Sequence, residues 1–186
     1  MFVQIDNSQV ESASAESAKH KLPDPAETSE DALARAKLLH ETIKGALLVV
    51  HRDFFDDENP HVLPSQSLED VFEELTRCQG VQVHWLTVDA DEMNIHHRPK
   101  TDFEKQAIEK IRNGAEQHSG LVDEQFQFVG RIPLANQCLK CHVKQRLNLN
   151  ERSAGLSITI PVKRSQEPKG QSQQFAPSNH TSVFGN

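Results

Sequence analysis

The feature that most constrains this chain of 186 residues is the short motif Cys138-Leu139-Lys140-Cys141-His142. Two thiols at this spacing can each add to a vinyl group of a porphyrin, and the residue that follows supplies an imidazole that can reach the iron from the same side. The motif therefore predicts a covalently attached c-type haem, with Cys138 and Cys141 as attachment points and His142 as proximal ligand.

The same cysteine spacing also occurs in zinc sites and thiol-exchange proteins. A structural zinc site usually combines two such pairs, whereas this chain offers only Cys138, Cys141, His142 and the distant Cys78. A thioredoxin-like site would begin a helix after a strand in a parallel α/β arrangement, which the sequence does not predict. Haem attachment is favoured, and a zinc-binding or thiol-redox interaction module using Cys138, Cys141 and His142 is the alternative.

Composition excludes two classes of protein. The formal net charge is −7 and hydrophobic residues make up 36% of the chain, so the sequence lacks the basic surface that nucleic-acid binding requires. No apolar run reaches the roughly 18 residues of a transmembrane helix. We expect no nucleic-acid partner and no transmembrane segment.

The N-terminus bears on localisation. It lacks the basic and apolar regions of a secretory signal, whereas c-type haem is made covalent outside the cytoplasm. We expect that a signal peptide was removed from this chain and that the protein is periplasmic or otherwise exported.

The chain divides into three parts. Residues 1–27 are polar, rich in Ser, Ala and Glu, and contain prolines at positions 23 and 25, which predicts a flexible arm. Residues 28–163 carry the periodic segments of one domain. Residues 164–186 consist mainly of polar residues, Pro and Gly, which predicts a disordered tail.

A long helix is predicted from Thr28 to about Phe55. Thr28 is a good N-cap, and the helix carries an apolar stripe with steps of three and four residues. His40 lies within this stripe and His51 lies beside it. Both imidazoles are therefore expected to face the core.

The remaining elements predict an α+β fold with antiparallel strands. Ser67 is expected to cap a second helix that ends before Gly80, and Thr101 and Glu104 form the capping box of a third. Alternating or β-rich segments predict three strands, at residues 81–88, 125–133 and 154–161.

A second axial ligand would decide the chemistry of the iron. The only methionines are Met1 and Met93, and Met93 follows acidic residues, so a histidine is the better candidate. From the residues alone the choice stays open among five histidines: His40, His51, His84, His96 and His97.

Supporting roles follow from residue type. Trp85, Phe126 and Phe128 are candidates to pack on or near the porphyrin, although ordinary core positions are the alternative. Basic residues around the motif are candidates to pair with haem propionates, and solvated surface is their alternative: Arg131, Lys140, Lys144 and Arg146.

Together these segments resemble the Tll0287-like haem domain family, formerly a domain of unknown function, over about residues 33–161. The resemblance lies in the helix segment ending Gly-Ala-Leu-Leu-Val-Val-His51, the strand around Trp85, the stretch from Pro99 into the next helix, Phe126 through the cysteine motif, and the closing strand at residues 154–160.

The resemblance implies a PAS-like antiparallel sheet flanked by helices, holding one haem c, with the long N-terminal helix supplying the distal ligand. Many relatives carry a cysteine where this chain carries His51, so ligation by His142 and His51 is implied, with His40 as reserve. Because both faces of the iron would be occupied, electron transfer or redox sensing with an unidentified partner protein is expected rather than enzymatic activity. PAS-like domains often pair through an N-terminal helix, which also implies a homodimer.

Overall fold

The computed structural model describes residues 22–54, 64–91, 94–135, 138–139, 142–143, 148 and 150–163. Within these ranges the elements follow one another as α1 (Ser29–Phe54), α2 (Pro64–Gln79), β1 (Gln82–Thr87), the 3₁₀ helix η2 (Ile95–His97), α3 (Asp102–Arg112), β2 (Gln117–Val122), β3 (Gln125–Pro133) and β4 (Ser153–Pro161).

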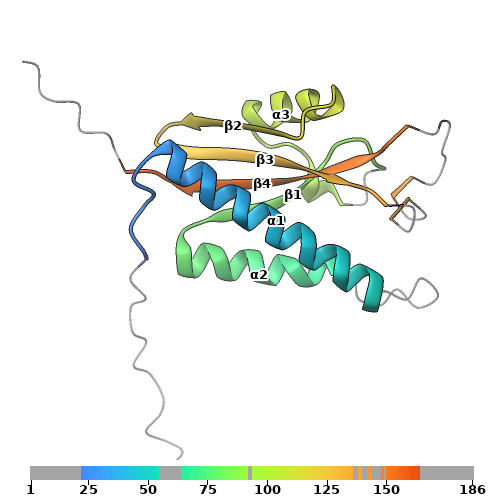
Figure 1. Cartoon of the computed structure of the whole chain (residues 1–186), viewed down its shortest axis with the longest axis horizontal. Helices are drawn as coiled ribbons and strands as arrows, with labels where there is room; N and C mark the ends of the chain where they lie inside the picture. The colour runs from blue at the N-terminus through green and yellow to red at the C-terminus, as the bar shows by residue number, and fades with distance from the viewer. Residues whose placement is uncertain are drawn as a thin grey trace, which may run out of the picture.

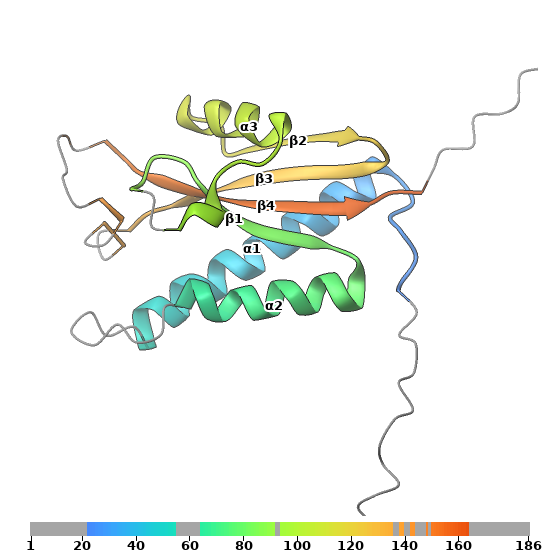
Figure 2. The same cartoon turned by 180° about the vertical axis from the view of Figure 1, so that it is seen from behind.

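The four strands form one antiparallel sheet in the order β1-β4-β3-β2. Helices α1 and α2 lie on one face of this sheet and α3 lies on the other (Figure 1), as the view from behind also shows (Figure 2). The predicted α+β fold, a PAS-like antiparallel sheet flanked by helices with a long N-terminal helix, is confirmed. None of the described helices is both long and apolar enough to cross a membrane.

The larger core lies between the sheet and the pair α1 and α2. Inward positions of α1, such as Ala36 and Ile43, meet Val83 and Trp85 of β1 and Phe128 of β3. Successive side chains of a strand alternate between the two faces of a sheet, so Leu86 and Val129 instead join the smaller core beneath α3. The strand residues of the two cores therefore come from alternating positions, which is the pattern that predicted these strands.

The sequence predicted two helix starts correctly. The Thr28 hydroxyl accepts a hydrogen bond from the Asp31 main-chain NH at 3.2 Å, and the capping box of Thr101 and Glu104 is present at the start of α3. The prediction that Ser67 caps the second helix was wrong. Helix α2 begins at Pro64, because proline fits the first helical position, where its missing NH leaves no hydrogen bond unmade.

Strand β2 was not predicted. It pairs with β3 through a tight turn in which Asp123 and Glu124 have positive φ angles of 48° and 62°. Such a turn normally contains Asn or Gly. The Asp-Glu sequence of this turn therefore does not indicate a hairpin.

The residues just ahead of α1 pack against the sheet, whereas most of the predicted arm (residues 1–27) and all of the predicted tail (164–186) lie outside the described residues. Ala26 is fully buried, its NH donates to the Pro161 carbonyl at 2.9 Å and its carbonyl accepts from the Lys163 NH at 2.9 Å. The chain just ahead of α1 is therefore held against the end of β4.

Candidate functional site

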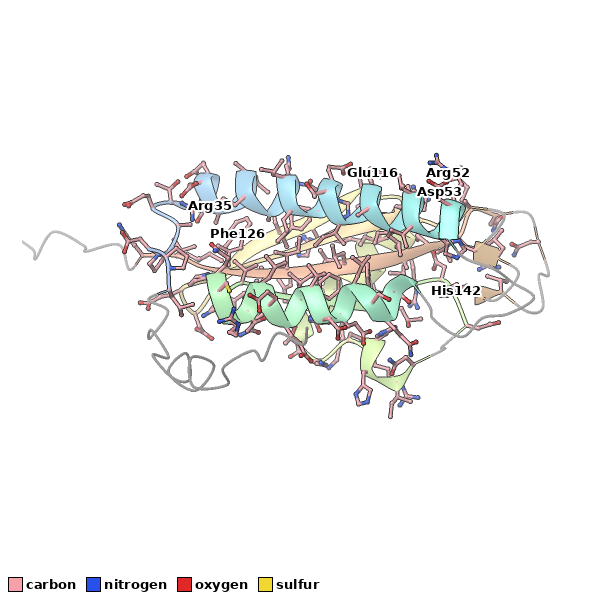
Figure 3. The ribbon with its side chains drawn as sticks, turned by 90° about the horizontal axis from the view of Figure 1, so that it is seen from below. Arg35, Arg52, Asp53, Glu116, Phe126 and His142 are labelled. Atoms are coloured by element: carbon pink, nitrogen blue, oxygen red, sulfur yellow. The ribbon has the colours of Figure 1, made fainter. Side chains whose placement is uncertain are left out.

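The candidate site lies at the end of the molecule where α1 and β3 end and α2 begins. Figure 3 shows His142 at the same end as Arg52 and Asp53 of α1, and Arg35 and Phe126 toward the opposite end. His51 belongs to the last turn of α1, beside Arg52. The structure thus brings His51 and His142, 91 positions apart by their residue numbers, to one end of the sheet.

The described part of the cysteine motif adopts a helical turn. The Leu139 NH donates to the Ala135 carbonyl at 3.2 Å, and the Val143 NH donates to the Leu139 carbonyl at 3.0 Å. Side chains four positions apart lie on the same face of a helical turn, so Cys138 and His142 share a face. Cys141, Lys140, Lys144 and Arg146 lie outside the described residues.

Two main-chain hydrogen bonds fix the segment that carries the motif, one at Leu134 and one at His142. Where it leaves β3, the Leu134 NH donates to the Arg152 carbonyl at 2.8 Å, just before β4 begins. Farther along, the Asp91 NH donates to the His142 carbonyl at 2.7 Å. The loop after β1 therefore fixes the main chain of His142.

Three histidines near this end, His51, His97 and His142, are close enough for electrostatic interaction, and we call them the histidine site. All three side chains are half-buried. Burial lowers the pKa of His142, positive charge on His51 and then on His97 lowers it further, and Asp91 acts in the opposite direction. His142 therefore favours the neutral imidazole, which is the form that binds a metal.

His97 has a carboxylate partner on α2. Its Nε2 atom lies 3.0 Å from Oε1 of Glu69. Glu69 follows the first turn of α2, in which the Ser65 carbonyl accepts a hydrogen bond from Trp85 Nε1 at 3.1 Å. Trp85 is thus buried beside the helix that carries Glu69. Its predicted contact with the porphyrin stays a prediction.

His40, the predicted reserve ligand, occupies a different place. It is 5% exposed, its ring meets Phe128 edge-on with centroids 5.6 Å apart, and it lies directly over Gly130 of β3. Burial lowers its pKa, opposed by a hydrogen bond with Glu41 and by the main chain of Gly130. His40 fills the core between α1 and the sheet, as the inward stripe predicted, and Phe128 lies beside it.

Arg131 points to the opposite face of the sheet from Gly130, because neighbouring residues of a strand alternate. Its guanidinium makes two ion pairs, with Glu116 Oε1 at 3.0 Å and Glu151 Oε2 at 3.0 Å, which raise its pKa. Its predicted pairing with haem propionates would have to compete with these carboxylates.

Cys78 lies near the C-terminal end of α2. Its thiol donates to Glu74 Oε1 at 2.8 Å, and this hydrogen bond, followed by burial, raises the pKa of the thiol. Cys78 is about 14 Å along the helix axis from Glu69. In the described parts of the chain, no three His, Cys, Asp or Glu side chains are arranged to hold a metal ion.

The described residues offer two imidazoles from different elements at one end of the sheet and no cage of three or more metal ligands. Two imidazoles from different elements, His51 and His142, lie close enough for the charge of one to be felt by the other, and Cys138 lies on the same face as His142. A porphyrin supplies the remaining donors to its own iron.

Comparison with known proteins identifies the family. The model of the Tll0287-like family matches residues 25–161. The chain belongs to the Tll0287-like family. The matched range includes the ordered residues ahead of α1 and ends with β4.

A solved member gives the fold independently. The crystal structure of the cyanobacterial heme-protein Tll0287 is similar to this chain, with a TM-score of 0.54 and 17% sequence identity over 70% of this chain and 95% of that one. At this identity the likeness establishes the fold alone. No curated protein matches the chain.

The residues that sequence reasoning missed are Glu69 and Asp91. Both are acidic residues in polar surroundings, and nothing in their spacing links them to the motif. His97 was one of the five candidate ligands, but its pairing with Glu69, 28 positions earlier, depends on how α2 packs.

Proposed function

We propose that this chain is a c-type monohaem protein that carries or senses electrons. Cys138 and Cys141 hold the haem, His142 is its proximal ligand and His51 its distal ligand. The observation that carries the proposal is that His51 of α1 lies near enough to His142 to affect its pKa, which attachment at the motif does not by itself require.

Two findings support haem as the bound group. The chain belongs to the Tll0287-like family, and the solved member with the same fold is a heme-protein. The neutral imidazole that burial favours at His142 is also the form that iron binds. When bound, the haem supplies a one-electron redox centre.

The residues favour electron transfer or sensing over catalysis. With His142 on one side of the iron and His51 on the other, no position is open for a substrate or gas. We therefore propose that the protein is not an enzyme, that it exchanges electrons with a partner protein, and that it works in the periplasm or another exported location.

The test is a spectroscopic and potentiometric titration of the protein purified from a host that matures c-type haems. We expect low-spin spectra in both oxidation states, sharp α and β bands on reduction, a reversible one-electron transition and slow carbon monoxide binding. A colourless protein that contains zinc and no iron would favour the zinc module instead. A high-spin ferric protein that binds carbon monoxide at once would favour an enzyme.

A further inference from the structure

The outer face of α1, opposite the face that packs on the sheet, carries exposed apolar side chains. Leu38 is 72% exposed and Val49 is 45% exposed. In Figure 1 no described helix or strand lies in front of α1, and Figure 2 shows α1 behind the sheet. A single exposed apolar side chain is ordinary on a protein surface, so the argument depends on how these residues are spaced and what surrounds them.

The spacing on the outer face is that of a helix that pairs with another helix. Residues that follow one another at alternating steps of four and three lie along one line of a helix and can face a second helix over its whole length. We call this line of α1 the outer seam, and it consists of Asp31, Arg35, Leu38, Thr42, Gly45, Val49 and Arg52. The middle of the outer seam is uncharged and both of its ends are charged.

The middle of the outer seam can be buried without leaving a donor unpaired. Thr42 carries its only polar side chain, and the Thr42 hydroxyl donates to the Leu38 carbonyl at 2.8 Å within the helix. Gly45 is exposed, and no atom lies within 4 Å of a Cβ placed on it. A second helix can therefore approach between Leu38 and Val49 without the cost of an unsatisfied polar group.

The outer seam is complementary to itself when two copies run antiparallel. A two-fold axis midway between Thr42 and Gly45 places Leu38 of one copy opposite Val49 of the other, and Thr42 opposite Gly45. Each copy then covers the exposed apolar side chains of its partner.

The charges along α1 favour the same direction. Glu41 and Lys44 form an ion pair on one flank of the helix, and antiparallel pairing brings Glu41 of each copy toward Lys44 of the other. Parallel pairing would instead set Glu41 against Glu41 and Arg35 against Arg35, which like-charge repulsion disfavours. At the ends, antiparallel pairing joins two groups that each contain both signs of charge: Asp31 with Arg35 from one copy, and Arg52 with Asp53 from the other.

We propose that a second copy of this chain packs on the outer seam, with the two α1 helices antiparallel. The contact is independent of the haem ligands proposed above, and it places the His51 ends of the two helices at opposite ends of the seam. Because each copy contributes only Leu38 and Val49 as large apolar side chains of the seam, the contact is small and the dimer forms in a concentration-dependent way.

Sedimentation equilibrium of the full chain at increasing concentration measures the pairing. We expect the mass to rise from that of one chain toward that of two. Leu38→Lys and Val49→Glu should each raise the dissociation constant by on the order of 10-fold or more, because each sets an uncompensated charge against an apolar side chain. The double variant Leu38→Lys/Val49→Glu should recover the dimer, since antiparallel pairing then sets an ammonium opposite each carboxylate.

Leu121→Lys is the matched control. Leu121 is 55% exposed but belongs to β2, so its replacement should leave the dissociation constant unchanged. Circular dichroism of each variant checks that α1 is still folded.

Three results would each overturn the inference. A wild type that stays monomeric at every concentration would leave the outer seam to residues 1–21 or to a different protein. Single variants that pair as well as the wild type would place the dimer contact elsewhere. A double variant that pairs no better than the single variants would contradict the antiparallel direction.

Discussion

His84 of β1 lies beside Glu104 of α3, with His84 Nε2 and Glu104 Oε1 2.8 Å apart. The carboxylate is only 5% exposed and also accepts from the Ser157 hydroxyl at 3.0 Å and the Lys100 NH at 2.6 Å. Burial raises the pKa of Glu104, but these hydrogen bonds, with His84 foremost, outweigh it and bring the pKa down to about 2.

The first prediction concerns Glu104→Gln. A pKa lowered from 4.5 to about 2 corresponds to about 3 kcal/mol of stability. Because the folded pKa is depressed, this contribution is fully present above pH 4.5 and is lost as the pH falls toward 2. Urea unfolding should show the variant about 2–3 kcal/mol less stable than wild type at pH 7, with the difference shrinking toward pH 2.

Glu109→Gln is the control for this prediction, since Glu109 is exposed on the same helix and its loss should change stability by less than about 0.5 kcal/mol. A stability difference between Glu104→Gln and wild type that stays constant from pH 7 to pH 2 would show that the carboxylate's charge contributes nothing.

The second prediction concerns Gly130→Ala. A Cβ at this position would overlap the ring of His40, and because His40 is enclosed by α1 and Phe128 it has little room to yield. We expect a loss of about 1–3 kcal/mol in the free energy of unfolding, as for other overpacked cores. In a His40→Ala background the same substitution should cost much less, since the ring that it meets is gone.

Gly45→Ala is the matched control for Gly130→Ala. Gly45 is exposed in α1 with no atom within 4 Å of an added Cβ, so alanine there should stabilise the protein by about 0.5–1 kcal/mol. Equal effects of Gly130→Ala with and without His40 would contradict the packing described for this ring.

Much of the fold follows from local sequence signals. The capping box of Thr101 and Glu104 and the alternation of β1 and β3 are local, because each depends on residues within one element. Strand β2 was missed because it ends in a turn of Asp123 and Glu124, whose positive φ angles are unusual for these residues.

The site was predictable only in part. The cysteine motif predicts His142, and the inward stripe of α1 placed His40 and His51 on the core side. That His40 rests on Gly130 while His51 lies at the same end of the sheet as His142 depends on where α1 crosses the sheet. The pairing of Arg131 with Glu116 and Glu151 likewise depends on tertiary packing, which no local pattern encodes.

The third prediction concerns the charge of the distal ligand. In haem-loaded His51→Cys, a thiolate at the iron would stabilise the ferric state by its negative charge. We expect the midpoint potential to fall by on the order of 0.1 V, a modest part of the roughly 0.8 V range that axial ligands span. Potentiometric titration measures the change, and His96→Cys should leave the potential unaltered.

If the potential of His51→Cys equals that of wild type while the spectrum is unchanged, the residue at position 51 does not bind the iron. The same result would contradict the distal role that is proposed above for His51.

Intact-mass spectrometry under denaturing conditions is a direct test of covalent haem attachment, because only a covalent group survives unfolding. For protein from a host that matures c-type haems, we expect the mass of the chain plus one haem, and the mass of the chain alone when Cys138 and Cys141 are both replaced by serine. A wild-type mass equal to that of the bare chain would contradict it.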